Sequence, residues 1–287
     1  MKKIAIATDS NSGLTQKAAE ELGVFVLPMP FFINDRLCME GLTIRHAEFF
    51  RLQREGAKIS TSHPSPQDVL DFWDKILADY EAILYIPMSS ALSSSCATAI
   101  ALSQDYGGRV VVIDSTRISA TQKQAVLDAK CMADRGASLE EIQKMLLDFD
   151  REAIIYVTVD NLKYLKEGGR ITPTVASMGT LLNIKPVLLI DGGVLDVYSK
   201  CRGLKAARKK MIEAIRTDIT ERFHCPDLKT LNLHAACCLA TEDALAWKQT
   251  LEDTFQAPCS LDRLPLSLAT HVGFGACGVA LTRKVNR

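Results

Sequence analysis

Residues 83–95 read ILYIPMSSALSSS, an apolar run followed directly by a turn rich in serine. Ile83–Ile86 is continuously apolar, which is typical of a strand buried on both faces of a parallel sheet. Ile4–Ala7 and Val110–Ile113 are runs of the same kind, and Phe25–Ile33 is expected to be an irregular strand because it carries two prolines. Patterns typical of helices separate these runs, so the sequence predicts alternating strands and helices around a parallel sheet.

Two of the intervening helices have a readable start. Ser65 can act as an N-cap, with Pro66 at the first helical position and Asp68 at the third. Ser138 and Glu141 have the spacing of a second capping box. The helices expected in this half of the chain are Thr15–Leu22, Arg45–Arg54, Pro66–Tyr80, Ser94–Gln104 and a segment from Ser138 to near Asp150.

The pattern changes after Asp150, where we place a domain boundary. Gly192 and Gly193 lie between two strand patterns and predict a hairpin. The expected strands are Ala153–Val159, Val187–Ile190, Val194–Ser199, Leu231–Ala235 and Val279–Thr282, and the expected helices are Gly203–Phe223 and Thr241–Phe255. The predicted fold class is α/β with two domains, an N-terminal parallel-sheet α/β/α domain (residues 1–150) and a C-terminal α+β domain (residues 151–287).

The composition is that of a globular protein with no general attraction to polyanions. Apolar residues make up 47% and charged residues 24%, and 34 basic residues balance 34 acidic ones. Zero net charge gives no long-range attraction to nucleic acid or to an anionic membrane. Ala82–Gln104 is free of charge, but Pro87 and its serines favour a strand, a turn and a helix over a membrane span. We therefore expect no nucleic-acid partner and no stable membrane insertion.

The cysteines and histidines suggest neither a metal site nor a redox motif. The nine cysteines are scattered without C-x-x-C spacing, and the five histidines lack metal-ligand spacing. The apolar stretch near Met1 is too short for a secretory signal. We expect reduced thiols in a cytoplasmic protein, with no metal and no cofactor.

Gly273–Gly278 (GFGACG) matches the G-x-G-x-x-G pattern of dinucleotide-binding loops. That pattern requires a βαβ unit with an acidic residue about 20 positions further on, and the sequence after Gly278 is too short to provide it. The sequence therefore predicts a glycine turn that enters a final strand. The G-x-S-x-G, Walker A and H-E-x-x-H motifs of other enzymes are absent.

Three hydroxyl-rich turns stand out in the first half of the chain: Thr8-Asp9-Ser10, Ser60–His63 and Ser89–Ser95. In open parallel sheets, ligands bind outside the carboxyl ends of the strands. Hydroxyls and free N–H groups at a helix start favour a carboxylate or a phosphate there. The alternative is that these residues only cap helices, which suits Ser65 and either Ser94 or Ser95.

Three features of the second half have both a structural and a functional interpretation. Gly168 and Gly169 suit a helix C-cap, and Arg170 either answers the helix dipole or binds an anion. His271 stands alone before the glycine turn, where a structural role is the alternative to a functional one. The predicted helix Ile171–Ile184 has no charged residue, so it either packs in the core or lines an apolar cavity.

Together these residues resemble the DegV family over nearly the whole chain. The likeness runs through Thr8-Asp9-Ser10, Thr61-Ser62-His63-Pro64-Ser65, Ser89–Ser95, Asp114-Ser115, Tyr164–Arg170, Asn183-Ile184-Lys185-Pro186, Lys200-x-Arg202-Gly203 and His271-Val272-Gly273-Phe274-Gly275. The chain differs from the family pattern at Ala91 and Ser94, where glycine is usual, and at Ser119–Lys123, where a glycine-rich stretch is usual.

The resemblance implies a two-domain protein that holds one long-chain fatty acid between its domains and is not an enzyme on its own. Several family members are the acyl-carrying subunit of a bacterial fatty acid kinase of phospholipid metabolism, in which an ATP-dependent kinase subunit phosphorylates the bound carboxylate. By this resemblance Thr61 and Ser93 would bind the carboxylate, with Ser62 and Ser94 in the same site. Arg170 and His271 would lie near the head group and assist phosphoryl transfer, and Ile171–Ile184 would line the tunnel.

Two other functions fit the same residues. A stand-alone enzyme acting on a small carboxylated or phosphorylated metabolite would need its own general base, for which Asp9 and His271 are the candidates. A lipid carrier or sensor without a kinase partner would need no such group.

Overall fold

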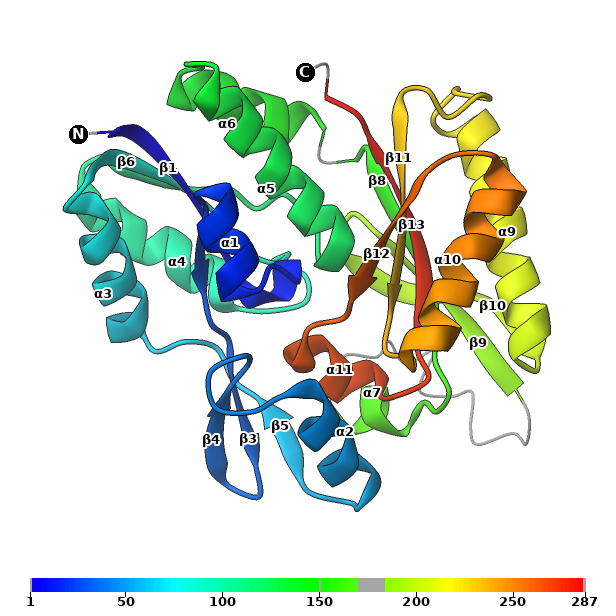
Figure 1. Ribbon diagram of the computed structural model, residues 1–287. Helices are drawn as coiled ribbons and strands as arrows, with labels where there is room; N and C mark the ends of the chain where they lie inside the picture. The colour runs from blue at the N-terminus through cyan, green and yellow to red at the C-terminus, as the bar shows by residue number, and fades with distance from the viewer. Residues whose placement is uncertain (1, 150, 170–183, 286–287) are drawn as a thin grey trace. The chain divides into compact units, whose positions relative to one another are not determined.

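The computed structural model describes residues 2–149, 151–169 and 184–285. The chain divides into two compact units between Asp150 and Arg151, here called unit 1 and unit 2. Figure 1 shows their elements in chain order. Each unit has its own sheet and its own core, so each is described by itself.

Unit 1 is built on a four-stranded sheet in the order β2-β1-β6-β7, in which every pair of neighbours is parallel. Its strands are β1 (Lys2–Asp9), β2 (Phe25–Leu27), β6 (Tyr80–Ile86) and β7 (Val110–Val112). The buried centre pairs Ala5 with Ile83 and Ala7 with Tyr85, as expected of continuous apolar runs. The predicted parallel sheet with intervening helices is therefore confirmed.

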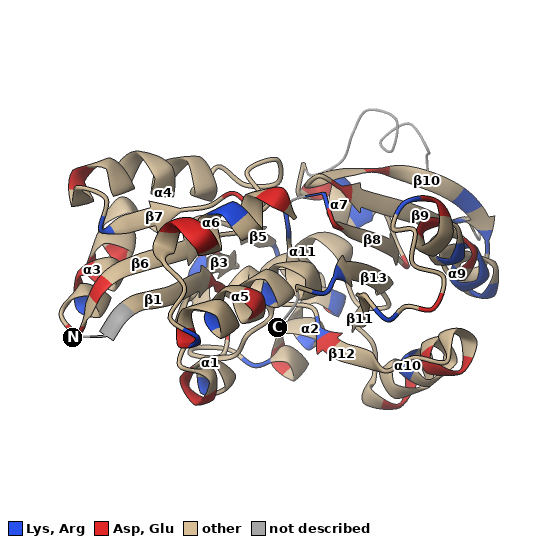
Figure 2. Cartoon of the chain, turned by 90° about the horizontal axis from the view of Figure 1, so that it is seen from above, with Lys and Arg blue, Asp and Glu red and all other residues tan. Residues whose placement is uncertain are grey.

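Helices cover both faces of this sheet, as Figure 2 shows from above. Trp73 of α3 and Ala99 of α4 pack with Ala5, Ala7 and Ile83 on one face. Helix α5 lies against β1 and β6 from the other face. The helices of unit 1 are α1 (Gln16–Leu22), α2 (His46–Arg54), α3 (Pro66–Leu77), α4 (Ser95–Ser103), α5 (Ser119–Asp134) and α6 (Leu139–Asp148), with short 3₁₀ turns η1 (Ser10–Ser12) and η2 (Gln104–Tyr106).

A second, antiparallel sheet in unit 1 was not predicted. It has the order β4-β3-β5 and consists of β3 (Pro30–Ile33), β4 (Arg36–Met39) and β5 (Ile59–Thr61). Phe25–Ile33 is thus two strands in two different sheets, with the chain changing sheets at Pro28-Met29. Ser60 and Thr61 belong to β5 of this second sheet and Ser62-His63 follow it, so this segment does not follow a strand of the parallel sheet.

The predicted capping boxes are confirmed at both positions. The Ser65 hydroxyl accepts from the backbone N–H of Asp68 at 3.1 Å, and the Asp68 carboxylate accepts from the N–H of Ser65 at 3.0 Å. Ser138 and Glu141 make the same reciprocal pair. The helix predicted to reach Tyr80 ends at Leu77, because Tyr80 begins β6.

Unit 2 contains a six-stranded mixed sheet in the order β10-β9-β8-β13-β11-β12. Its strands are β8 (Ala153–Thr158), β9 (Ile184–Asp191), β10 (Val194–Arg202), β11 (Leu231–Cys237), β12 (Cys259–Arg263) and β13 (Cys277–Arg283), and its described helices are α7 (Lys163–Glu167), α9 (Leu204–Glu221), α10 (Thr241–Phe255) and α11 (Leu266–Val272). Gly192 and Gly193, at φ 55° and 78°, form the turn between the antiparallel strands β9 and β10, which confirms the predicted hairpin. Strand β12 and helix α11 were not predicted.

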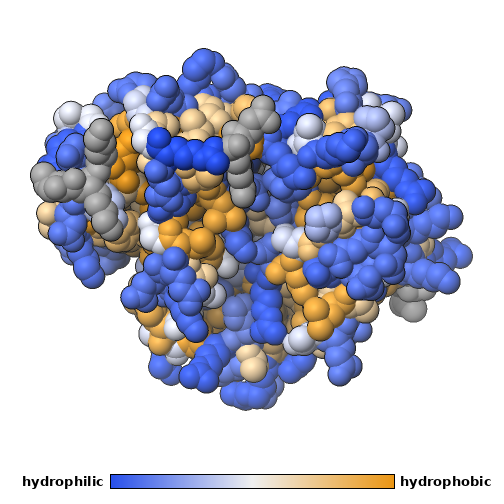
Figure 3. Space-filling model, turned by 45° about the horizontal axis from the view of Figure 1, so that its top comes forward, coloured by the Kyte–Doolittle hydropathy of each residue, from blue (hydrophilic) through white to orange (hydrophobic). Residues whose placement is uncertain are grey.

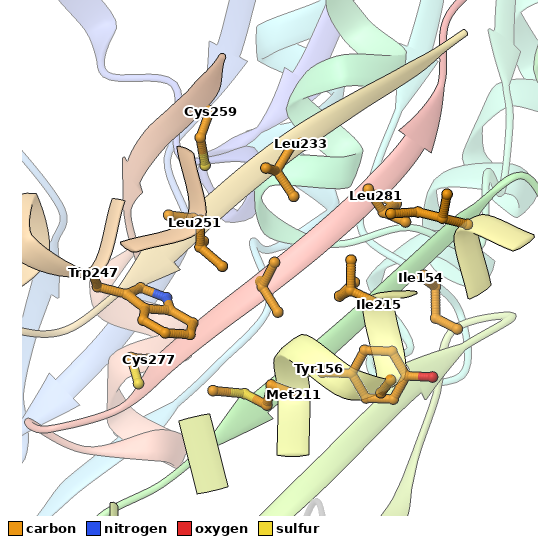
Figure 4. Packing of buried hydrophobic residues seen from close by; sticks show 14 of the residues in the cluster. Ile154, Tyr156, Met211, Ile215, Leu233, Trp247, Leu251, Cys259, Cys277 and Leu281 are labelled. Atoms are coloured by element: carbon orange, nitrogen blue, oxygen red, sulfur yellow. The ribbon is translucent and has the colours of Figure 1, made fainter. Parts of the chain in front are cut away.

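The core of unit 2 lies between one face of this sheet and helices α9 and α10 (Figure 4). Trp247 of α10 is buried there, and its indole N–H donates to the carbonyl of Gly278 in β13 at 3.0 Å. Met211 and Ile215 of α9 pack beside Tyr156 of β8. A buried indole with a satisfied N–H fixes α10 on the sheet in one orientation.

The charge-free stretch Ala82–Gln104 becomes most of β6, a turn and helix α4. Helix α4 carries no charged residue and is drawn entirely in tan in Figure 2. None of the described helices has both the length and the apolar character needed to cross a bilayer. The face seen in Figure 3 is largely hydrophilic with smaller apolar areas between, as a chain with 24% charged residues leads us to expect.

Candidate functional site

The carboxyl end of the parallel sheet in unit 1 is organised around Asp9. This side chain is fully buried and accepts three hydrogen bonds from different segments. Met88 N–H donates to Oδ2 at 2.8 Å, Asn11 N–H donates to Oδ1 at 2.9 Å, and Gln122 Nε2 donates to Oδ1 at 3.1 Å. Burial raises the pKa of Asp9 above its ordinary value, and the hydrogen bonds from Met88, Gln122 and Asn11 oppose that rise.

Gln122 joins the ends of the two central strands. Besides Asp9, its Nε2 lies 3.0 Å from Thr8 Oγ1 and 3.3 Å from the carbonyl of Ile86. The Thr8 hydroxyl itself donates to that carbonyl at 2.7 Å. Helix α5 is therefore connected by one side chain to the last residues of both β1 and β6.

The Thr61-Ser62 segment reaches the same edge through the second sheet. Ser10 Oγ accepts from the N–H of Met29 at 3.0 Å, just before β3 begins. The next residue, Pro30, accepts at its carbonyl from the N–H of Ser62 at 3.1 Å. Thr61 pairs with Phe31 in the adjacent register position. Thr61 and Ser62 are thus connected to Ser10 through the Met29-Pro30 backbone. Thr61 nevertheless belongs to β5, which is not part of the parallel sheet.

Ser93 and Ser94 lie in the turn after β6. This turn begins at Met88, whose N–H donates to the Asp9 carboxylate. Further along the turn, the N–H of Ser93 donates to the carbonyl of Ser89 at 3.2 Å. Ser93 Oγ accepts from the N–H of Ser95 at 3.2 Å and donates to Ser95 Oγ at 3.0 Å. Ser94 is the N-cap residue of α4, but its side chain makes no capping hydrogen bond. Ser93 therefore supports the helix start, and Ser95 of the same hydroxyl-rich turn is its hydrogen-bonded neighbour.

In unit 2 the end of α7 packs against the end of α11. Gly168 is the C-cap of α7, and Gly169 follows with φ 64°, so both glycines lie at the predicted C-cap. His271 lies in the last turn of α11. A Cβ placed on Gly168 would be 2.0 Å from His271 Nδ1, so the imidazole ring occupies the space where a side chain would be.

The glycine turn after α11 also packs against α7 and the residues just before it. Gly273, at φ 73°, lies against the ring of Tyr164, which a Cβ would meet at 2.4 Å. Gly275, at φ 96°, lies against Asp160, whose Cβ would be 2.9 Å away. The turn leads directly into β13, which is antiparallel to β8 and β11. The predicted turn into a final strand is confirmed, and its glycines serve close packing and positive φ.

The remaining lysine and arginine motifs lie on the β9–β10 hairpin. Lys185 Nζ donates to the carbonyl of Asp160 at 2.8 Å and forms an ion pair with its carboxylate. In the β9–β10 hairpin Lys200 pairs with Pro186, and Arg202 pairs with Ile184. Segments far apart in the sequence but shared with the family pattern thus meet in unit 2.

Arg170 and residues 171–183 of the predicted tunnel helix lie outside the described residues, and Ile184 begins strand β9. In the described part of the chain, no three His, Cys, Asp or Glu side chains come together as potential metal ligands.

Comparisons with known proteins agree on one family. The family model described as "Uncharacterised protein, DegV family" matches residues 3–284. A DegV domain-containing protein of Caldanaerobacter subterraneus is 31% identical over 297 residues, which span 99% of this chain and 100% of the relative.

Two solved structures are similar in fold over almost their full length. One, described as "Fatty Acid Binding of a DegV family Protein from Thermus thermophilus", has a TM-score of 0.88 at 30% identity and covers 98% of this chain and 99% of that chain. The other, a Thermotoga maritima protein whose structure is described as revealing a fatty acid binding function, has a TM-score of 0.78 at 25% identity and covers 99% and 100% of the two chains.

The buried carboxylate gives a prediction with a definite sign in pH. Because the folded-state pKa of Asp9 is raised above its ordinary value of 3.8, its contribution to stability is fully present below that value and is lost as the pH rises through the folded-state pKa. Asp9→Asn does not titrate and turns an NH₂ group toward a donor, so it should lower the free energy of unfolding by about 1–3 kcal/mol. The difference between wild type and variant should be largest at and below about pH 4 and shrink as the pH rises.

Urea unfolding of unit 1 checks this, with Trp73 fluorescence as the signal in a Trp247→Phe background. The exposed Asp79→Asn, which makes the same chemical change on the surface of unit 1, is the matched control. A wild-type advantage that grew with pH would contradict the raised pKa.

Proposed function

We propose that this chain, which belongs to the DegV family, binds one long-chain fatty acid in a buried tunnel and presents its carboxylate to a separate ATP-dependent kinase subunit. The main support is the set of hydroxyl-bearing segments that converge on the Asp9 edge of unit 1. The Thermus thermophilus protein described as binding fatty acid shares 30% of its residues with this chain and almost the whole fold.

The energetics of such a ligand fit neutral hydroxyl donors at the head group. Burying an acyl chain of about 14 methylenes gives at most roughly 11 kcal/mol, at about 0.8 kcal/mol for each methylene. Part of that gain is offset by the lost freedom of the ligand. The carboxylate must still be hydrogen-bonded when it leaves water, and Thr61, Ser93 and their neighbours Ser62 and Ser94 are suited to that task.

Phosphoryl transfer requires positive charge near the carboxylate. In the proposal this charge comes from Arg170, from His271 if it is protonated, and from the kinase with its own metal ion and ATP. Arg170 follows Gly168 and Gly169 directly in sequence, and His271 packs against Gly168. This chain has no Walker A motif for binding ATP, which supports a division of labour between two subunits.

The geometry of Asp9 argues against a stand-alone enzyme that uses this residue as its base. Both carboxylate oxygens already accept hydrogen bonds, from Met88, Asn11 and Gln122, and the side chain is fully buried. A general base must reach the proton of its substrate within hydrogen-bond distance. Asp9 is therefore better suited to holding the turn that carries Ser93.

Loss of a single head-group hydroxyl should weaken retention of the fatty acid. Hydrogen bonds to charged groups contribute about 1.5–3 kcal/mol, so Thr61→Ala and Ser93→Ala should each weaken binding roughly 10- to 100-fold. Native mass spectrometry of the freshly purified chain measures this directly, with one acid per wild-type chain expected. Thr250→Ala, on the exposed side of α10, makes the same chemical change away from the site and should keep full occupancy. Full occupancy in both site variants would show that the carboxylate lies elsewhere.

A separate experiment tests presentation to a kinase. Arg170→Ala removes a charge that in the proposal meets mainly the developing acyl phosphate, so the acid should stay bound while acyl-phosphate formation falls by orders of magnitude. The assay supplies ATP and the kinase subunit of a fatty acid kinase to the loaded chain. If wild type bound fatty acid but formed no acyl phosphate with any such subunit, a carrier or sensor would be the better description. If Arg170→Ala emptied the tunnel, Arg170 would be a ligand anchor.

A further inference from the structure

We propose that Gly168 is a positioning residue for His271, because the missing side chain at position 168 is what allows the imidazole ring to lie against the end of α7. The role of the ring at the head group rests on the proposed function. The contact between Gly168 and His271 does not depend on it.

The backbone at position 168 gives no reason for glycine. Gly168 has φ −77° and ψ −9°, a right-handed helical conformation that every L-residue adopts without strain. Its neighbour Gly169 is the opposite case, with φ 64° and, among the described residues other than its chain neighbours, no atom within 4 Å of the position that a Cβ would take. Gly169 is explained by its conformation, and Gly168 is explained only by the space it leaves.

That space is filled by one edge of the His271 ring. A Cβ on Gly168 would lie 2.0 Å from Nδ1 and 2.7 Å from Cε1, far inside the ordinary van der Waals contact of about 3.5–4.0 Å between heavy atoms. The next atom is the carbonyl oxygen of Tyr164, at 3.2 Å, which is tight but not overlapping. The Cβ of an alanine at position 168 would therefore overlap mainly with the imidazole ring of His271.

The backbone around His271 leaves little room to move away. Gly273 lies directly against the Tyr164 ring, and Ala269 and Leu266 of α11 are fully buried. The His271 side chain, in contrast, can rotate about its Cα–Cβ bond. The expected response to a Cβ at position 168 is that the ring swings away while the fold of unit 2 is kept.

A double-mutant cycle tests this with Gly168→Ala, His271→Ala and the pair combined. The first readout is the ring ¹H–¹⁵N spectrum, in which His271→Ala identifies the His271 signals among those of the five histidines. We expect Gly168→Ala to shift these signals and to reduce fatty acid occupancy by the same factor as His271→Ala, within about two-fold. The double variant should lose no more fatty acid than His271→Ala alone. Its melting temperature should exceed that of Gly168→Ala, because it has no imidazole ring for the alanine Cβ to displace.

Gly169→Ala is the matched control, since it strains the backbone without meeting the ring. Its effect on the melting temperature should simply add to that of His271→Ala. Unshifted ring signals in Gly168→Ala, or losses that multiply in the double variant, would overturn the inference. If the wild-type chain carried no fatty acid, the proposed function would fail, while ring signals and melting temperatures would still decide the contact.

Discussion

The buried carboxylate of Asp9 is the interaction on which the arrangement of unit 1 depends. It accepts hydrogen bonds from η1, from the turn after β6 and from α5, so three segments meet at one side chain. A buried N–H left without an acceptor costs about 1–3 kcal/mol, which makes a shared acceptor effective in fixing all three. The serine turn that begins at Met88 and the start of β3 beside Ser10 both take their positions from this edge.

This arrangement favours binding over catalysis in unit 1. A carboxylate whose oxygens are occupied by donors holds structure together, and the hydroxyls around it are neutral groups that suit a carboxylate ligand. The basic residues Arg170 and His271 belong to unit 2. Membership of the DegV family and the likeness to the Thermus thermophilus protein described as binding fatty acid agree with a protein that holds a lipid.

Features coded by local chemistry could be predicted from the sequence. The boxes at Ser65 and Ser138 and the Gly192-Gly193 hairpin depend on residues a few positions apart, and the resemblance to the DegV family is confirmed. Helix α5 was missed because it begins after Ile118, whose side chain cannot accept a capping hydrogen bond, and Ser119 has positive φ. The β4-β3-β5 sheet depends on pairing between distant segments, which apolar periodicity does not show. Likewise, Gly168 and Gly169 were recognised as a C-cap, but the contact of Gly168 with His271 is a tertiary feature.

Binding of the carboxylate can be observed directly by ¹³C NMR of a long-chain fatty acid labelled at its carboxyl carbon and added to the delipidated chain. We expect one bound resonance that saturates at one acid per chain. The pKa of the bound carboxyl should differ from that of the unbound acid, because the bound group is buried and hydrogen-bonded by hydroxyl donors. A spectrum that shows only the unbound acid, at concentrations where the chain remains folded, would contradict this expectation.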